Sequence, residues 1–163
     1  MILVAVGTQF PFDRLVETVD RWAATSGTDV VGQIGPSTYK PAHIKAQTFF
    51  PPKEFESLLK HADVVIAHCG MGSILSALSL GKPIIVMPRS ASRGEHRNDH
   101  QFATAQRFSS RPGVTIAWDE AELSRCLDRI GALQDISSSS PIPPKAPREL
   151  TDRLRAFLCE GRR

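Results

Sequence analysis

One stretch of the chain, residues 63–105, constrains the fold more than any other. It begins with an apolar run at residues 64–67, passes through the glycine-rich turn at 68–73 into a helical pattern, and reaches a second apolar run at 84–87. Short apolar runs are typical of strands that are buried on both faces. A strand, a helix and a second strand in this order form a βαβ unit, so the sequence predicts a parallel sheet.

The turn in this stretch has the residue types that a bound anion needs. Gly70 and Gly72 allow backbone amides to approach a ligand closely, and Ser73 adds a hydroxyl at the start of the following helix. The free N–H groups and the positive dipole end of that helix point to the same place, at the carboxyl end of a strand. The alternative is that the glycines only permit a tight turn.

The other strands are expected at residues 2–6, 29–34, 47–50 and 113–117. The first strand ends in Gly7-Thr8-Gln9, a second turn at the same end of the sheet and a second candidate for diphosphate contacts, although a plain turn is an equal alternative. Together the elements predict one doubly wound, Rossmann-like α/β domain with a mostly parallel sheet in the order 3-2-1-4-5-6.

Helix signals separate these strands. Pro11 suits the first turn of a helix that carries Leu15 and Val19 on one face. A second helix is expected at 53–61, and Asp119 with Glu122 forms the start of another. These connections have the length and pattern that a parallel sheet requires.

Composition supports a single domain and narrows the partners. The 163 residues are 41% hydrophobic and carry a net charge of +3 from twenty basic and seventeen acidic residues, so no nucleic-acid partner is expected. The three cysteines show no C-x-x-C spacing, and Cys69 is interpreted as a packing residue. Without a signal peptide or a long apolar run, we expect a cytoplasmic protein whose membrane attachment is peripheral.

The larger pattern is similar to a known enzyme family. The sequence H-C-G-M-G-S-I-L-S-A-L-x-x-G-K-P-I-I-V-M-P, followed by N-D-H-Q-x-x-x-A, resembles the glycosyltransferase family 28 C-terminal domain found in MurG, the nucleotide-sugar half of a GT-B fold. The opening residues 2–15 look like the small soluble subunit of bacterial exopolysaccharide enzymes. The eukaryotic enzyme that adds the second GlcNAc to dolichol-diphosphate-GlcNAc has a similar subunit. The resemblance covers roughly residues 1–135.

This resemblance implies an activity. We expect the donor-binding, catalytic subunit of an inverting UDP-sugar glycosyltransferase. It would add glucuronate, glucose or N-acetylglucosamine to a polyprenyl-diphosphate-linked acceptor in exopolysaccharide or glycolipid synthesis. The chain has room for only one of the two Rossmann-like domains of a complete GT-B enzyme. No cofactor and no metal are expected, and the sequence contains no Asp-x-Asp motif that would hold a manganese ion.

The resemblance also assigns site residues. The glycine turn would stabilise the leaving diphosphate, His100 and Gln101 would orient the sugar, and His68 would lie beside the diphosphate as a possible catalytic residue. Many family members have Glu where this chain has Ser76, and that Glu holds the ribose hydroxyls; here another group must replace it. The predicted donor site comprises Gly7, Thr8, Gly70, Met71, Gly72, Ser73, Ser76, His100 and Gln101.

A polar loop and a linker lie outside these motifs. The loop is expected at residues 90–99, and arginines occur in it and just before it, at Arg89, Arg93 and Arg97. Either all three are solvated, or one of them contacts a phosphate or a sugar carboxylate. Residues 136–146 are a Ser/Pro linker.

The tail at 147–163 is an amphipathic helix with Leu150, Leu154, Phe157 and Leu158 on one stripe. The sequence leaves three positions open for this helix: folded back on its own domain, docked on a membrane-anchored, acceptor-binding partner subunit, or bound to a membrane surface. The resemblance favours the partner, which would recruit the protein to the inner face of the membrane.

Two other classes of function are compatible with such a domain. One is a non-catalytic nucleotide-sugar sensor or scaffold, which the serine at position 76 favours. The other is a dinucleotide-dependent oxidoreductase, but Gly7-Thr8-Gln9 does not continue into G-x-G-x-x-G and no acidic residue follows a second strand at the usual distance.

Overall fold

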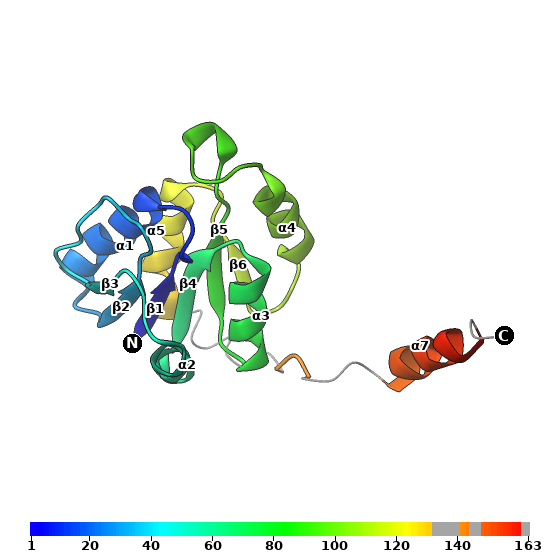
Figure 1. Ribbon diagram of the computed structural model, residues 1–163. Helices are drawn as coiled ribbons and strands as arrows, with labels where there is room; N and C mark the ends of the chain where they lie inside the picture. The colour runs from blue at the N-terminus through cyan, green and yellow to red at the C-terminus, as the bar shows by residue number, and fades with distance from the viewer. Residues whose placement is uncertain (132–140, 144–147, 161–163) are drawn as a thin grey trace.

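Six parallel strands form one sheet at the centre of the molecule (Figure 1). The computed structural model describes residues 1–131, 141–143 and 148–160. The strand order is β3-β2-β1-β4-β5-β6, which confirms the predicted parallel sheet and its order. The strands are β1 (Ile2–Ala5), β2 (Val30–Gln33), β3 (Lys45–Gln47), β4 (Val64–His68), β5 (Ile84–Met87) and β6 (Val114–Ile116).

Helices cover both faces of this sheet (Figure 1). One face packs against α1 (Asp13–Ser26) and α5 (Glu120–Asp128). The other packs against α2 (Pro52–His61), α3 (Met71–Ser79) and α4 (His100–Phe108). Alternate residues of each strand belong to the two hydrophobic clusters: Ile2 and Val4 join the first, and Leu3 and Ala5 join the second. Strands that are buried on both faces explain the continuous apolar runs in the sequence.

The chain reverses its winding direction between β1 and β4. From β1 the sheet grows through β2 to β3, whereas β4 pairs with the opposite edge of β1. Ala5 and Ala67 are register partners, so the turns that follow β1 and β4 leave the sheet side by side. In an open α/β sheet this point is where ligands bind.

Two local predictions were wrong. The strand expected at 47–50 is β3 at Lys45–Gln47, because residues 48–50 leave the sheet and the Phe50 N–H donates to the side chain of Gln33 at 2.9 Å. Pro11 lies before α1 rather than in its first turn, since the helix begins at Asp13 with the buried Phe12 as its N-cap. The Asp119 start is confirmed: its carboxylate accepts the Glu122 N–H at 2.7 Å.

The last described segments follow the domain. The Ile142 N–H donates to the Leu78 carbonyl at 3.1 Å, and the Ile142 side chain packs against the α3 face of the core. Helix α7 (Arg148–Glu160) comes next, and most of the predicted linker lies outside the described residues. The division into domain, linker and tail therefore stays a prediction. Within the described part of the chain, no helix combines the length and apolarity that crossing a bilayer requires.

Candidate functional site

Helix α3 presents its N-terminus at the carboxyl edge of the sheet. Gly70 is its N-cap, and among the described residues no side chain caps the first turn. The preceding backbone is held by the Cys69 N–H, which donates to the Met87 carbonyl at 3.0 Å, and by the Gly70 N–H, which donates to the His68 carbonyl at 2.8 Å. The N–H groups of the first helical turn therefore face the edge of the sheet without a side-chain acceptor.

The glycines around this turn have different reasons to be glycine. A Cβ on Gly70 would lie 2.4 Å from Nε2 of His68, and a Cβ on Gly7, which has φ +82°, would lie 3.2 Å from Cε1 of the same ring. These two glycines make room for the imidazole. A Cβ on Gly72 would meet nothing within 4 Å. Packing within the protein therefore does not require a glycine at position 72. A glycine there is also unfavourable, because glycine destabilises a helix by about 1 kcal/mol relative to alanine.

His68 is a neutral acceptor in this arrangement. Its Nδ1 lies 3.2 Å from the Ala5 carbonyl oxygen, and because a carbonyl only accepts, Nδ1 carries the proton and Nε2 keeps its lone pair. Burial lowers the pKa of His68 to about 4, against the hydrogen bond to Ala5 and with help from the positive charge of Arg89. At neutral pH the ring can accept a hydrogen bond from a ligand but carries no charge.

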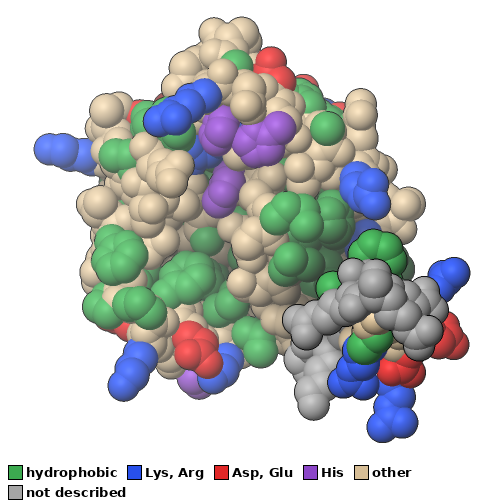
Figure 2. All heavy atoms as spheres, turned by 45° about the vertical axis from the view of Figure 1, so that its right-hand side comes forward, with side chains coloured by type: hydrophobic (Ala, Val, Ile, Leu, Met, Phe, Trp, Pro, Cys, Tyr) green, Lys and Arg blue, Asp and Glu red, His purple; other side chains and the backbone are tan. Residues whose placement is uncertain are grey.

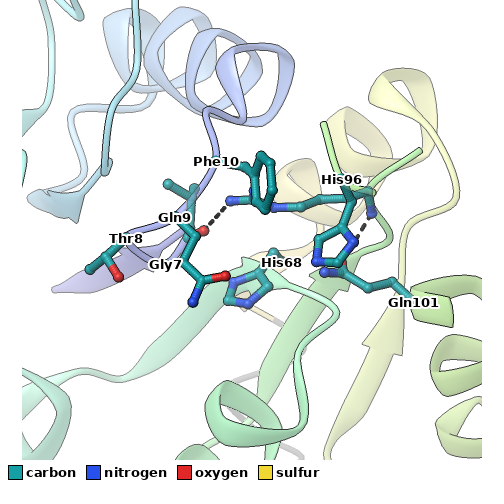
Figure 3. Close-up of a pocket in the computed structure, with 9 residues that line it drawn as sticks. Gly7, Thr8, Gln9, Phe10, His68, His96 and Gln101 are labelled. Atoms are coloured by element: carbon teal, nitrogen blue, oxygen red, sulfur yellow. Dashed lines mark hydrogen bonds between the residues drawn. The ribbon is translucent and has the colours of Figure 1, made fainter. Parts of the chain in front are cut away.

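Two hollows open on either side of Gly7 at this edge. The Arg89 hollow, of about 240 Å³, is shown in Figure 3, where Gln9, His68, His96 and Gln101 surround it. The Ser76 hollow, of about 260 Å³, lies towards α2 and α3. The Arg89 hollow is lined by Val6, Gly7, Thr8, Gln9, Phe10, His68, Arg89, His96 and Gln101, and the Ser76 hollow by Ala5, Gly7, Gln33, Phe55, Leu59, Val65, Gly72, Ser73 and Ser76.

The predicted site residues divide between these hollows. Gly7 lines both, Thr8, His68 and Gln101 line the Arg89 hollow, and Gly72, Ser73 and Ser76 line the Ser76 hollow. The Thr8 side chain points away from His68 in Figure 3.

Gly70 and Met71 line neither hollow; they form the start of α3, between His68 of the Arg89 hollow and Gly72 of the Ser76 hollow in the sequence. His100 lines neither of these two hollows; its exposed ring packs edge-on against His96 with centroids 4.7 Å apart.

Gln101 lines the Arg89 hollow and also makes a hydrogen bond within the protein. Its side chain is 3% exposed, and its Oε1 accepts the backbone N–H of Arg89 at 3.1 Å. The amide thus fixes the segment that follows β5. Its role towards a ligand stays a prediction.

Sequence reasoning missed part of the Arg89 hollow. His96 and Phe10 line it, with ring centroids 5.2 Å apart, yet no motif singles them out. Among the three arginines that the sequence could not rank, Arg89 is buried, whereas Arg93 and Arg97 are exposed. Figure 2 shows histidine side chains gathered around a depression in the surface.

The fold is a Rossmann-like α/β domain that matches one half of GT-B glycosyltransferase structures. Comparison with known proteins identifies the family: residues 1–132 match the glycosyltransferase family 28 C-terminal domain, and the chain belongs to that family.

A curated relative is the mouse UDP-N-acetylglucosamine transferase subunit ALG13, which is 31% identical over 116 residues, 64% of this chain and 10% of the relative. The chain thus matches about a tenth of that relative's length.

Solved structures share the fold. The calicheamicin glycosyltransferase CalG4 superposes with a TM-score of 0.62 at 18% identity over 99% of this chain and 44% of CalG4. MurG of Acinetobacter baumannii superposes with a TM-score of 0.60 at 15% identity over 84% of this chain and 44% of MurG. The chain therefore spans less than half of each of these glycosyltransferases.

Proposed function

We propose that the chain is the donor-binding, catalytic subunit of an inverting UDP-sugar glycosyltransferase. The observation that supports this most is the uncapped start of α3, with Ser73, beside two hollows that share Gly7 as a wall. A nucleotide sugar has a nucleoside, a diphosphate and a sugar in a row. The edge offers a hollow, an anion-binding helix start and a second hollow.

The Ser76 hollow suits the nucleoside. Its walls combine apolar side chains, Phe55 and Leu59, with the hydroxyls of Ser73 and Ser76. A flat base packs against apolar surface, and ribose needs hydrogen-bonding groups. Because Ser76 is shorter than a glutamate, we expect the ribose contact to be weaker than a charge-assisted one, or to pass through water.

The start of α3 would then stabilise the leaving diphosphate. As the bond between the anomeric carbon and the diphosphate oxygen breaks, negative charge grows on the diphosphate. We expect the N–H groups of residues 71–73 and the Ser73 hydroxyl to donate hydrogen bonds to it. We propose that no metal is needed. Among the described residues, no group of three or more His, Cys, Asp or Glu side chains lies close enough to hold a metal ion.

The sugar would occupy the Arg89 hollow. There Nε2 of the neutral His68 would accept a hydrogen bond from a sugar hydroxyl, and Gln101 would contribute its remaining amide donors. His100 would close the outer rim through its contact with His96. We assign no general base to this chain; we expect the group that takes the acceptor proton to come from the acceptor side.

The acceptor half would be a second protein. The mouse relative is named as a subunit of a transferase, and the apolar stripe of α7 is at least half exposed at each of its positions, Leu150, Leu154, Phe157 and Leu158. An apolar helix stripe of this kind needs a cover. We propose that it docks on a membrane-anchored subunit that binds a polyprenyl-diphosphate-linked sugar, and that the chain is cytoplasmic and reaches the inner face of the membrane through it.

Transfer assays with and without the partner test this proposal. The purified chain should bind UDP in a titration but transfer sugar negligibly. Co-expression with a membrane-anchored, acceptor-binding subunit should move it to the membrane fraction and start turnover. Removal of residues 147–163 should return it to the cytosol with an unchanged melting temperature of the domain. Robust transfer by the isolated, monomeric chain would contradict the two-subunit arrangement.

A non-catalytic nucleotide-sugar sensor is the second candidate, and Ser76 favours it because the ribose-holding glutamate of many relatives is absent. Binding of UDP-sugar without transfer, in the presence of a partner that is competent with another donor subunit, would decide for the sensor.

A further inference from the structure

Arg89 is a buried cation with no ion pair among the described residues. It follows β5 at the carboxyl edge, is 3% exposed, and forms part of the wall of the Arg89 hollow. Its Nη1 donates to the Glu95 carbonyl at 3.1 Å and its Nη2 donates to the Val6 carbonyl. Its buried Nε has no hydrogen-bond partner in the part of the chain that the structure describes. Buried charges are ordinarily paired, so this arrangement needs an explanation.

The surrounding charges do not balance. Arg14 pairs with Glu95 at 2.5 Å and with Glu120 at 3.2 Å, and Arg93 pairs with Glu120 at 3.1 Å. The two carboxylates of Glu95 and Glu120 are therefore paired with the two guanidinium groups of Arg14 and Arg93. The third guanidinium group, that of Arg89, has no carboxylate partner among the described residues and packs over the Phe12 ring at 5.1 Å.

Nothing else in the wall compensates for this charge. Among the described residues that line the hollow, none is Asp or Glu. Burial lowers the pKa of His68 to about 4 and also lowers the pKa of His96, so both rings are neutral at pH 7. Burial lowers the pKa of Arg89 to about 10, which leaves it protonated at pH 7. The hollow is therefore a polar cavity with one formal charge, and that charge is positive.

We propose that Arg89 makes the hollow selective for a sugar that carries a carboxylate, so that the donor is the nucleotide of a hexuronic acid. The inference rests on the proposed function, which places the sugar in this hollow. A carboxylate would give the guanidinium of Arg89 an ion-pair partner, whereas a neutral hexose would leave this cation buried beside uncharged hydroxyl groups. Attraction between charges a few ångströms apart is strong in a partly buried site, even without direct contact.

A phosphate of the donor's own diphosphate has the same chemistry as a carboxylate. The two sources differ in what they predict. If Arg89 meets the diphosphate, every UDP-sugar and UDP itself depend on it equally. If Arg89 meets a sugar carboxylate, only the uronate donor depends on it.

Calorimetric titration of the full chain with UDP, UDP-glucose and UDP-glucuronate separates these cases. We expect UDP-glucuronate to bind at least tenfold more tightly than UDP-glucose, since a hydrogen bond to a charged group typically contributes a factor of about ten to a hundred. In Arg89→Met this ratio should fall to about one while UDP affinity changes little, and Arg89→Lys should keep part of the ratio.

A second variant covers the risk that Arg89→Met does not fold, because the side chain also holds two carbonyl groups. Gln9 is exposed, and Figure 3 shows its side chain directed towards His68 across the hollow. Gln9→Glu adds a carboxylate to the wall and should reduce the ratio several-fold, whereas the matched neutral change Gln9→Met should not.

Three results would overturn the inference. Equal affinities of the wild type for the two UDP-sugars would show that the hollow does not select a carboxylate. Equal weakening of UDP and UDP-glucuronate by Arg89→Met would assign Arg89 to the diphosphate. Failure of the wild type to bind UDP at all would overturn the proposed function, and the inference with it. Selectivity that disappears in Arg89→Met and falls several-fold in Gln9→Glu, but not in Gln9→Met, would support it.

Discussion

The two hollows at the carboxyl edge share Gly7 but are built from opposite kinds of side chain. The Ser76 hollow has apolar walls from α2 and the sheet, with two hydroxyls from α3. The Arg89 hollow has a buried guanidinium, two imidazoles and two amides. Apolar walls recognise a ligand by its shape, whereas charged and titratable groups discriminate between ligands that are similar in shape but differ in charge. Under the proposed function, the nucleoside would be selected by its shape and the sugar by electrostatic interactions.

The difference should be visible in the pH dependence of stability. His68 lies only in the Arg89 hollow, and its pKa of about 4 in the folded protein is below the ordinary 6.5 of the unfolded chain. The unfolded chain therefore takes up more protons between these values. The stabilising contribution is complete above pH 6.5 and is lost as the pH falls towards 4, with a maximum of about 3 kcal/mol.

Urea unfolding at pH 7.5 and at pH 4.5 measures this effect. In His68→Gln, which cannot titrate at this position, the difference in unfolding free energy between the two pH values should shrink by about that amount. An unchanged difference would mean that the ring is protonated in the folded protein.

The sequence predicted the glycine turn at the start of α3 better than it predicted the Arg89 hollow. The order of the strands and the position of the glycine turn follow from periodicities that are local in the chain, so residues 64–73 could be placed correctly. The burial of Arg89 depends on the Val6 carbonyl, 83 positions away, and the position of His96 depends on how a loop folds over the edge. Such long-range contacts leave no periodic signal.

The residues 47–50 show the same limit on a smaller scale. Both phenylalanines suggest a buried strand, but Phe49 is 54% exposed and only Phe50 is buried. The hydrogen bond from Phe50 to the Gln33 side chain takes this segment away from the sheet. Hydrophobic type alone could not reveal that a side-chain acceptor competes with the strand ladder.

Ser73→Ala tests the helix start between the hollows. The methyl group fits at this partly buried position, so the fold should be retained. Loss of one hydroxyl donor to developing charge typically lowers a rate by about 10²-fold. Turnover of the purified complex with its partner measures this. Full activity of Ser73→Ala would show that the hydroxyl has no role in the transition state.

Gly70→Ala and Gly72→Ala form a matched pair on the same turn. The added Cβ of Gly70→Ala would lie 2.4 Å from Nε2 of His68, and overpacking of this kind costs about 1–3 kcal/mol. Gly72→Ala meets nothing within 4 Å and should leave stability unchanged or raise it by up to about 1 kcal/mol.

Thermal unfolding and UDP titration of both variants distinguish packing from binding. We expect Gly70→Ala to lower the melting temperature, and Gly72→Ala to keep it but to bind UDP more weakly, because the methyl group would occupy space that the ligand needs. Normal UDP affinity in Gly72→Ala would show that the open space at Gly72 is not used by the nucleotide.

Ser76→Glu gives the smallest effect and acts on the Ser76 hollow alone. Ser76 is exposed on α3 and lines this hollow, at the position where the family resemblance implies a glutamate that holds ribose. A restored charge-assisted hydrogen bond should tighten UDP binding by about 1.5 kcal/mol, or about tenfold, and leave the preference between UDP-sugars unchanged. Ser79→Glu, on the same helix but outside the lining of the hollow, adds the same charge as a control and should not tighten binding. If Ser76→Glu folds normally and its UDP affinity equals that of the wild type, the ribose lies elsewhere, and the division of the edge into a nucleoside hollow and a sugar hollow is wrong.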